Sequence, residues 1–266
     1  MDHDADALTV LQITDPHLLA DPEGTLLGMR TRETLDAVLA HIREQGRQPD
    51  VVLATGDISQ DGSDESYRYF REQTAFFDCP VFWFMGNHDV REAMDRVIGD
   101  TGANRRRFRA RGWQLVFLDS SVPESVHGRL AEEELQWLDQ ALSDYPQDNA
   151  LVCLHHHPID ISAQWMNAIG LRNHEEFFEV LKRHPQVRGV LWGHIHQDLD
   201  QQIDGYRLLA TPSTSIQFAP NSREFSVDDV PPGYRWLTLH PDGEIETRVE
   251  RIPAGDYGLD LDSSGY

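Results

Sequence analysis

Up to residue 192 the chain alternates short apolar runs with segments in which apolar residues have a helical spacing. The runs are bounded by turn residues, which is typical of buried strands. They cover residues 8–14, 51–55, 81–85, 115–118, 151–154 and 190–192. Between them, the spacing of apolar residues places these on one face of a helix. The residues concerned are Leu35, Val38, Leu39 and Ile42 in one segment and Leu135, Leu138 and Leu142 in another.

A third helix is indicated by Asn173 followed three residues later by Glu176, a pattern typical of a capped helix start. Its apolar side would consist of Phe177, Phe178 and Leu181. The order strand, helix, strand, helix, strand predicts βαβ units with helices packed on a sheet.

The pattern changes after His196. Two pairs of strand-like segments, each joined by an Asp-Gly turn, predict two hairpins that add a second sheet. The paired segments are 197–203 with 206–211, and 234–239 with 244–251. The proline-rich residues 212–233 between them are too many for a simple turn, and we expect this loop to carry function. We expect one domain over residues 8–253, with tails at 1–7 and 254–266, the second mobile or held against the surface.

The chain is acidic, with 23 Lys and Arg against 45 Asp and Glu and a formal net charge of −22. This charge argues against a broad surface for nucleic acid or for an anionic membrane. The one basic run contains Arg105, Arg106, Arg107, Arg109 and Arg111. It is either a phosphate contact or a solvated edge that offsets some of the acidity. The edge is favoured because only Phe108 could offer an aromatic platform.

Cys79 and Cys153 are the only cysteines. Each lies in or beside a predicted strand, so we expect packed thiols rather than a disulfide framework. The first residues lack the basic start of a secretion signal, and no apolar run approaches the length of a membrane span. We therefore expect a protein of the reducing cytoplasm, a monomer or a homodimer, without membrane or nucleic-acid partners.

Metal-ligand residue types recur at the ends of the predicted strands. Five polar clusters follow apolar runs: Asp15-Pro16-His17, Gly56-Asp57, Gly86-Asn87-His88-Asp89, His155-His156-His157-Pro158 and Gly193-His194-Ile195-His196. Each alone has an ordinary interpretation, since Gly-Asp is a common turn and a His-x-His pair is common on surfaces. Five in succession indicate one site along one edge of a sheet.

Seven side chains in these clusters offer oxygen or nitrogen donors: Asp15, His17, Asp57, Asn87, His156, His194 and His196. Seven donors exceed the needs of one tetrahedral zinc ion. They suit two divalent ions that share a carboxylate, which lie about 3.5–4 Å apart in such sites. Imidazole and carboxylate without thiolate favour Fe(II) or Mn(II), with Zn(II) as a further candidate, over Ca(II) or Cu(I).

These clusters resemble the D-x-H, G-D, G-N-H-[DE], H and G-H-x-H pattern of the calcineurin-like metallophosphoesterases. Further segments resemble bacterial class III 3′,5′-cyclic AMP phosphodiesterases, namely Leu11-Gln12-Ile13-Thr14-Asp15, Ala54-Thr55-Gly56-Asp57 and Ala210-Thr211-Pro212-Ser213-Thr214. The resemblance spans nearly the whole chain. It implies an α/β fold, a four-layer α-β-β-α sandwich of two mixed β-sheets flanked by helices. It also implies a dinuclear-metal hydrolase that opens 3′,5′-cyclic AMP to 5′-AMP by attack of a metal-bridging hydroxide on phosphorus.

The same resemblance implies a role for each ligand. The first ion would be held by Asp15, His17 and His196, the second by Asn87, His156 and His194, with Asp57 as the bridge between them. The H-x-P placement of the family favours His156 over its neighbours His155 and His157, which would support it.

His88 would protonate the leaving 3′ oxygen, and Asp89 would orient its imidazole, so these two are the expected catalytic residues. The alternative for His88 is a supporting hydrogen bond. The residues expected to contact the substrate are His17, Asp57, Asn87, His88 and His196.

Other features bear on substrate and metal. Purple acid phosphatases carry a tyrosine where this chain has Gln60, so a ferric-tyrosinate centre is not expected. Trp165 or Phe218 would either stack on adenine or serve as packing. Two other functions fit the same motifs. One is a broader phosphodiesterase or phosphomonoesterase that acts on cyclic GMP or 2′,3′-cyclic nucleotides, and the other is a non-catalytic scaffold.

Overall fold

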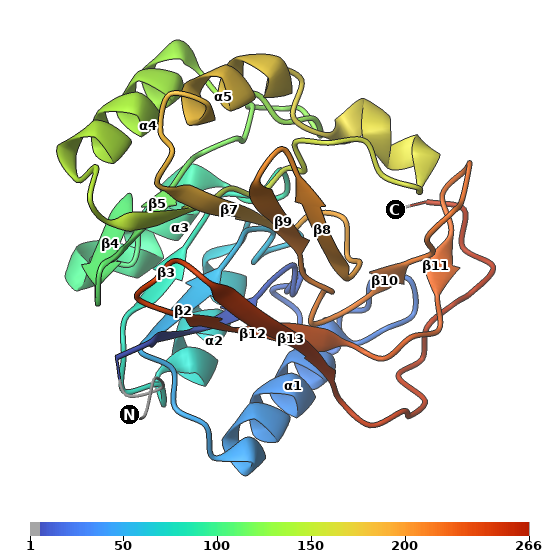
Figure 1. Cartoon of the computed structure of the whole chain (residues 1–266). Helices are drawn as coiled ribbons and strands as arrows, with labels where there is room; N and C mark the ends of the chain where they lie inside the picture. Colours follow the sequence, from blue (N-terminus) through green and yellow to red (C-terminus); the bar gives the residue numbers. More distant parts are fainter. Residues whose placement is uncertain (1–5, 266) are drawn as a thin grey trace.

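Two mixed β-sheets lie face to face in the computed structural model, which describes residues 6–265 (Figure 1). The first has five strands in the order β13-β12-β1-β2-β3, and the second has six in the order β4-β5-β6-β7-β9-β8. The first sheet contains β1 (Leu8–Ile13), β2 (Val51–Ala54), β3 (Val81–Trp83), β12 (Gly233–Leu239) and β13 (Ile245–Arg251). The second contains β4 (Arg107–Ala110), β5 (Trp113–Phe117), β6 (Asn149–Cys153), β7 (Val187–Trp192), β8 (Leu199–Ile203) and β9 (Tyr206–Ala210).

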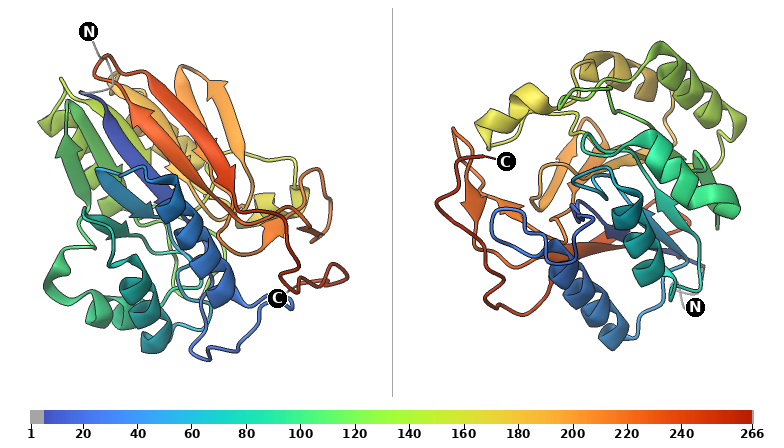
Figure 2. Two further views of the ribbon diagram at one scale, coloured as in Figure 1. Left: turned by 90° about the horizontal axis from the view of Figure 1, so that it is seen from below. Right: turned by 180° about the vertical axis from the view of Figure 1, so that it is seen from behind.

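Helices cover the outer faces of both sheets. In Figure 1, α4 (Glu132–Asp144) and α5 (His174–Leu181) lie above the second sheet. Three others lie together beside the first sheet (Figure 2), namely α1 (Thr31–Gln45), α2 (Asp64–Thr74) and α3 (Arg91–Ile98). Two 3-10 helices, η1 (Gly99–Thr101) and η2 (Gln164–Ile169), and a small ribbon of β10 (Gln217–Phe218) with β11 (Val227–Asp228) complete the described elements. The four-layer α-β-β-α fold expected from the family resemblance is confirmed.

The inner strands, such as β2 and β6, are largely apolar because both of their faces are buried. Along β1, Leu8 and Val10 belong to the core between the two sheets, whereas Leu11 and Ile13 belong to the core under the helices. Side chains of a strand alternate between its faces, so a strand with a core on each side must be apolar at nearly every position.

The parallel pairing of strands brings the polar clusters together. In the first sheet β1, β2 and β3 run parallel, and in the second β5, β6, β7 and β9 run parallel. Parallel neighbours end at the same edge of a sheet, and open α/β sheets bind ligands at the carboxyl ends of their strands. The residues that follow β1, β2, β3, β6 and β7 therefore meet along one edge of the sandwich.

The predicted strands and hairpins form, but the expected place of one hairpin is wrong. The hairpin of β8 and β9 extends the second sheet, because β9 pairs with β7. The hairpin of β12 and β13 instead joins the first sheet, where β12 pairs antiparallel with β1. Each sheet thus combines segments that are distant along the chain, and local patterns contain no information about which edge a hairpin joins.

The three predicted helices form as α1, α4 and α5, while α2, α3 and η2 were not predicted. The side chain of Asn173 does not cap α5 as expected. Its amide instead exchanges two hydrogen bonds with the backbone of Leu130, at 3.0 and 2.9 Å. The backbone N–H and C=O of Leu130 are buried and need hydrogen-bond partners, and the Asn173 amide supplies both.

The arginine run forms an exposed edge, which supports the interpretation as a solvated edge. It includes the edge strand β4, and its arginines pair with carboxylates at 2.7–3.0 Å. The pairs are Arg106–Glu134, Arg107–Asp144, Arg109–Asp148 and Arg111–Asp50. Most of the positive charge of the run is therefore neutralised by the chain itself.

Both cysteines are free thiols, as expected, with Cys153 buried and Cys79 partly buried. In the described part of the chain, no helix combines the length and apolar character that crossing a membrane requires. Of the two expected tails, residues 1–5 and Tyr266 lie outside the described residues. Residues 254–265 run along the surface, where the backbone N–H of Asp260 donates to the carbonyl of Leu27 at 2.8 Å.

Replacement of Phe70 by alanine should destabilise the protein by about 3–5 kcal/mol, the usual effect of truncating a buried phenylalanine. The Phe70 side chain is 0% exposed and packs edge-to-face on Trp83 with ring centroids 5.0 Å apart. Urea unfolding measures this loss. The control Val230→Ala, at a position that is 37% exposed, should change stability by less than about 0.5 kcal/mol. Equal losses in the two variants would contradict this packing of α2 on the first sheet.

Candidate metal centre

The chain turns sharply where the strands end, in a backbone conformation that few side chains adopt. Five of the seven predicted ligands have positive φ angles. They are Asp15 (53°), His17 (47°), Asp57 (47°), His194 (65°) and His196 (50°). This left-handed conformation costs a non-glycine residue about 1–3 kcal/mol and is concentrated at functional sites. The fold tolerates this strain at five positions that face one another.

Asp15, His17 and His196 form the first group of ligand atoms, and all three side chains are buried. The Nε2 atoms of His17 and His196 lie 3.1 Å apart. Oδ1 of Asp15 lies 3.3 Å from Nε2 of His196 and 4.0 Å from Nε2 of His17.

The other nitrogen of each ring fixes which atom carries the proton. Nδ1 of His17 donates to the amide oxygen of Gln60 at 2.7 Å, and Nδ1 of His196 donates to the carbonyl of Ile216 at 2.8 Å. In a neutral imidazole the Nε2 atom then has no proton. Burial lowers the pKa of His17 to about 3, although Asp57 opposes the shift, so this ring is neutral. A cation near both Nε2 atoms would take them as ligands, so the geometry fits a metal ion. Hydrogen bonding of the outer ring nitrogen is also typical of metal-bound histidines.

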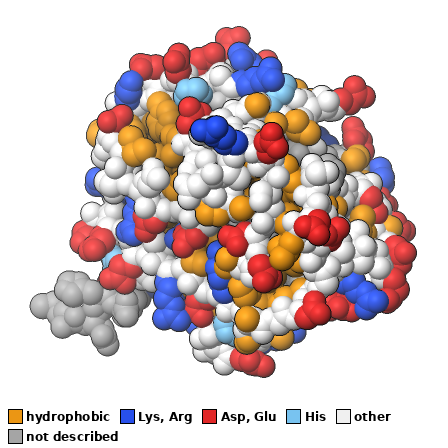
Figure 3. All heavy atoms as spheres, turned by 90° about the vertical axis from the view of Figure 1, so that its right-hand side faces the viewer, with side chains coloured by type: hydrophobic (Ala, Val, Ile, Leu, Met, Phe, Trp, Pro, Cys, Tyr) orange, Lys and Arg blue, Asp and Glu red, His pale blue; other side chains and the backbone are white. Residues whose placement is uncertain are grey.

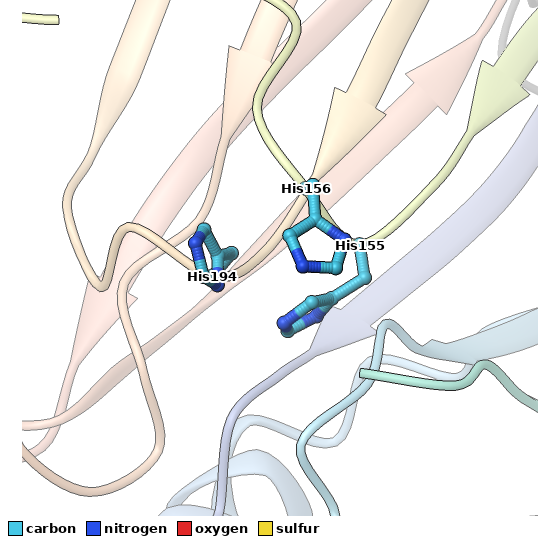
Figure 4. Close-up of side chains that lie close together, drawn as sticks. All are labelled: His155, His156 and His194. Carbon is cyan, nitrogen blue, oxygen red and sulfur yellow. The ribbon is translucent and has the colours of Figure 1, made fainter. Parts of the chain in front are cut away.

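A second group consists of His155, His156 and His194 (Figure 4). Nδ1 of His156 is hydrogen-bonded to Ser120 Oγ at 2.8 Å, and Nε2 of His194 donates to the carbonyl of Ile169 at 3.1 Å. Nε2 of His156 is buried with no hydrogen-bond partner among residues 6–265. The same holds for Oδ1 of Asn87. Buried polar atoms without a partner are rare and costly, and both of these have the chemistry of a metal ligand.

Asp57 lies between the two groups. Its Oδ2 is 3.3 Å from Nε2 of His155 and 3.8 Å from Nε2 of His17. Its Oδ1 accepts a hydrogen bond from the backbone of His88 at 2.8 Å. Although burial opposes ionisation, His155 and His88 keep the pKa of Asp57 well below its usual value. The carboxylate therefore has one anchored oxygen and one oxygen that faces both groups, as a bridging ligand requires.

Gly86 allows the loop after β3 to approach Asp57 closely. A Cβ atom at position 86 would collide with both Oδ1 and the backbone nitrogen of Asp57. Glycine is therefore needed here for space, which explains its place before Asn87 and His88 in the cluster.

His155 occupies a more central place than the sequence indicated. Its Nδ1 donates to the carbonyl of Thr55 at 2.7 Å, and its Nε2 lies against Asp57. Burial opposes protonation of His155, but the Asp57 carboxylate raises its pKa to about 9. Nε2 of His155, like Nε2 of His156, has no hydrogen-bond partner among the described residues, but it lies 3.3 Å from Oδ2 of Asp57 and can support that carboxylate. The choice of His156 as the ligand, made from the H-x-P placement, stays a prediction.

His88 lies beside the first group, and the Asp89 carboxylate that follows it is hydrogen-bonded to other loops. The His88 ring meets that of His17 edge-to-face, with centroids 5.0 Å apart. The Asp89 carboxylate accepts from the backbone of Ser59 (3.0 Å) and Gly86 (2.9 Å) and from the hydroxyl of Tyr67 (3.0 Å). Among residues 6–265 neither a hydrogen bond nor an ion pair joins Asp89 to the His88 imidazole, so the predicted orienting role of Asp89 stays a prediction. Asp89 connects the loops after β2 and β3, because its carboxylate accepts hydrogen bonds from backbone N–H groups of both loops.

A cavity of about 190 Å³ opens beside the centre. His88, Asn87 and His194 are among the residues that line it. Its apolar walls include Val126, Trp165, Ile169, Phe218 and Phe225, and Gly265 from the C-terminal segment borders it. In Figure 1 the C-terminal end lies next to η2 and β11, on the same side of the molecule.

The two aromatic residues singled out in the sequence play different roles. Phe218 is 2% exposed and stacks on the His196 ring, with centroids 4.2 Å apart and planes at 12°. The stacking holds the His196 ring, and the same side chain also borders the cavity. Trp165 is half-buried and meets Phe218 and Phe225 edge-to-face at 5.2 Å. Phe225 was missed, because the proline-rich loop that contains it has no periodic pattern.

The sequence matches the profile of the Calcineurin-like phosphoesterase family over residues 8–198. The chain belongs to this family. The 3′,5′-cyclic adenosine monophosphate phosphodiesterase CpdA of Pseudomonas aeruginosa is 44% identical over 263 residues, which cover 99% of this chain and 96% of that relative. CpdA of Escherichia coli K12 is 43% identical over 259 residues, covering 97% and 94%. The resemblance to bacterial cyclic AMP phosphodiesterases is thus confirmed along nearly the whole sequence.

Two solved structures share the fold. A dimetal phosphatase from Danio rerio superposes with a TM-score of 0.63 at 19% identity and covers 92% of this chain and 99% of that chain. A purple acid phosphatase from yellow lupin seeds gives a TM-score of 0.62 at 12% identity, covering 92% and 52%. At such identities the likeness concerns the fold alone.

The roles of His155 and His156 can be separated by metal content. His156→Gln should reduce bound Mn(II) by about half, because one of the two ions loses a ligand. Loss of a residue that only supports a ligand weakens metal affinity by about 10–100-fold but does not remove the site. His155→Gln should therefore retain both ions at saturating Mn(II). Elemental analysis after gel filtration measures the difference. The reverse result would exchange the roles assigned to these two histidines.

Proposed function

We propose that this protein is a metal-dependent phosphodiesterase that hydrolyses 3′,5′-cyclic AMP to 5′-AMP with two divalent cations. The observation that carries the proposal is the pair of facing Nε2 atoms of His17 and His196, 3.1 Å apart, with the Asp57 carboxylate beside them. The names of the relatives that are 40–44% identical over nearly the full length supply the substrate.

The residues present fit two cations. We assign Asp15, His17 and His196 to one and Asn87, His156 and His194 to the other, with Asp57 shared between them. Oxygen and imidazole donors without thiolate favour Fe(II) or Mn(II), and also suit Zn(II). When bound, such ions stabilise charge on phosphate oxygens and lower the pKa of water.

The charge of the site is compatible with a phosphate diester in spite of the acidic surface. The chain carries a net charge of −22, and acidic side chains are spread over the face shown in Figure 3. Only Asp15 and Asp57 among the seven ligands are acidic, so two divalent cations leave the site positive. Surface carboxylates further away than about 8 Å are largely screened at physiological salt.

The phosphate would lie among His17, Asp57, Asn87, His88 and His196. Hydrolysis adds the oxygen of water to phosphorus and breaks the bond from phosphorus to the 3′ oxygen. We assign His88 as the acid that delivers a proton to that leaving oxygen, because its ring borders both His17 and the cavity. Asp89 supports this chemistry indirectly, since it holds the loops that carry Asp57 and His88.

The cavity beside the centre is the candidate site for the nucleoside. Its walls are mostly apolar, and they adjoin His88 and Asn87, where the phosphate would lie. Trp165 and Phe225 offer ring edges and faces to a base, while Val126, which is 55% exposed, lies at the cavity wall.

The free thiols Cys79 and Cys153 agree with a place in the reducing cytoplasm.

A substrate panel tests the proposed function. Purified enzyme loaded with Mn(II), Fe(II) or Zn(II) would be assayed on 3′,5′-cyclic AMP, 3′,5′-cyclic GMP, 2′,3′-cyclic AMP and an aryl phosphate monoester. The highest kcat/KM should be for 3′,5′-cyclic AMP, with 5′-AMP as the product. A preference for the aryl monoester or for 2′,3′-cyclic AMP would overturn the substrate assignment, and inactivity on all four with metal bound would overturn the function.

His88→Ala should lower kcat on cyclic AMP by about 10²–10⁴-fold, the usual contribution of a general acid. The loss should be much smaller on a diester with a 4-nitrophenyl leaving group, because that oxygen departs without a proton. Bound Mn(II) should be unchanged in the variant. Equal losses on the two substrates would show that His88 acts by some means other than proton donation.

Trp165→Ala should raise KM for cyclic AMP by about 3–10-fold, which corresponds to an aromatic contact of about 0.5–1.5 kcal/mol. The kcat/KM for a diester without a base should stay near the wild-type value. Trp137→Ala is the matched control, since Trp137 is a partly buried tryptophan that packs under Arg106 away from the cavity. An unchanged KM for cyclic AMP in Trp165→Ala would remove this side chain from the nucleoside site.

A further inference from the structure

A chain of buried polar side chains connects Arg235 to Asp15. Nε of Arg235 donates to Thr211 Oγ1 at 3.0 Å, and Thr211 Oγ1 donates to Oε1 of Gln12. Nε2 of Gln12 donates to Thr55 Oγ1 at 2.8 Å. Thr55 Oγ1 then donates to Thr14 Oγ1 at 2.6 Å, and Thr14 Oγ1 donates to Oδ2 of Asp15 at 2.5 Å. Every residue of this chain is 0–1% exposed.

The chemistry at the two ends fixes the direction of every bond between them. A guanidinium group can only donate, and an ionised carboxylate can only accept. Each threonine hydroxyl has a single proton, so each donates its one hydrogen bond to the next group on the side of Asp15. Hydrogen bonds aligned in this way polarise one another and become stronger.

The other donors of Gln12 and Arg235 are already used in separate hydrogen bonds. The second amide proton of Gln12 goes to the carbonyl of Trp192 at 3.1 Å. The remaining donors of Arg235 go to Asp198, Thr247 and backbone carbonyls. A missing link would therefore leave a buried group without a partner, which costs about 1–3 kcal/mol.

This series of hydrogen bonds determines the orientation of the Asp15 carboxylate. Oδ2 is taken by Thr14, and this leaves Oδ1 as the oxygen that faces His196 at 3.3 Å and His17 at 4.0 Å. The backbone N–H of His194 donates to both oxygens, at 3.1 and 3.0 Å, and so does not itself choose between two orientations. Gly193 leaves room for the bond, because a Cβ atom there would collide with Thr14 Oγ1.

We propose that Gln12 is a positioning residue for the cation held by Asp15, His17 and His196, and that it acts through Thr55 and Thr14. This inference rests on the proposed function, since it requires that Asp15 bind a metal. It also explains a polar residue inside β1, whose neighbours Leu11 and Ile13 are apolar and buried. Gln12 joins both sheets to the ligand loop, because Thr211 follows β9 in the second sheet and Thr55 follows β2 in the first.

The test compares Gln12→Leu with Gln114→Leu. Gln114 is also fully buried in a strand, β5, and its Nε2 donates to the carbonyl of Tyr145 at 3.0 Å, away from the centre. Competition with a chelator, without substrate, measures the two Mn(II) dissociation constants of each protein. Gln12→Leu should weaken one of the two by about 10–100-fold, as the loss of a residue that orients a ligand does. Gln114→Leu should leave both constants at wild-type values, and excess Mn(II) should restore most of the kcat of Gln12→Leu.

The outcomes separate the two proposals. If Gln12→Leu binds Mn(II) like Gln114→Leu while wild type binds two ions, the positioning role is overturned and the proposed function stands. If wild type binds none of Mn(II), Fe(II) and Zn(II), both are overturned. Should Gln12→Leu fail to fold, Thr14→Val and Thr14→Ser decide instead. Serine keeps the hydroxyl and should retain the affinity that valine loses, and equal affinities in these two variants would overturn the role of the chain.

Discussion

The approach of two imidazole nitrogens to within 3.1 Å of each other in a buried space is the constraint on which the site depends. His17 and His196 each give their Nδ1 proton to an oxygen acceptor, so the lone pairs of their Nε2 atoms face each other at 3.1 Å. Burial lowers the pKa of His17 to about 3, although Asp57 opposes the shift, so this ring is neutral. A cation bound here would have the Nε2 atoms of both rings as ligands.

The rest of the fold keeps this arrangement in place. The two packed sheets and their covering helices provide the stability that offsets five left-handed turns at the ligand positions. Asp89 ties the loop after β2 to the loop after β3, and Phe218 holds the His196 ring from behind. The hydrogen-bonded chain through Gln12 reaches the site from between the sheets. Each of these contacts limits the freedom of a ligand to turn away from the centre.

Much of this could be predicted from the sequence, because both main signals are local. Strands buried on two faces appear as unbroken apolar runs, and ligand types directly after such runs mark one edge of a sheet. Features that depend on long-range contacts could not be predicted in this way. The place of the hairpin of β12 and β13 beside β1 is one such feature. The partners of Asp89 are another, since Tyr67 lies 22 positions away and on a helix that the pattern did not reveal.

The position of metal ions in crystals of the protein grown with Mn(II) tests the central claim most directly. Anomalous diffraction at the manganese edge should show two peaks on either side of the Asp57 carboxylate, about 3.5–4 Å apart. One peak should lie within bonding distance of Nε2 of His17 and of His196. Peaks elsewhere, or none between these two rings in crystals that contain manganese, would contradict the account.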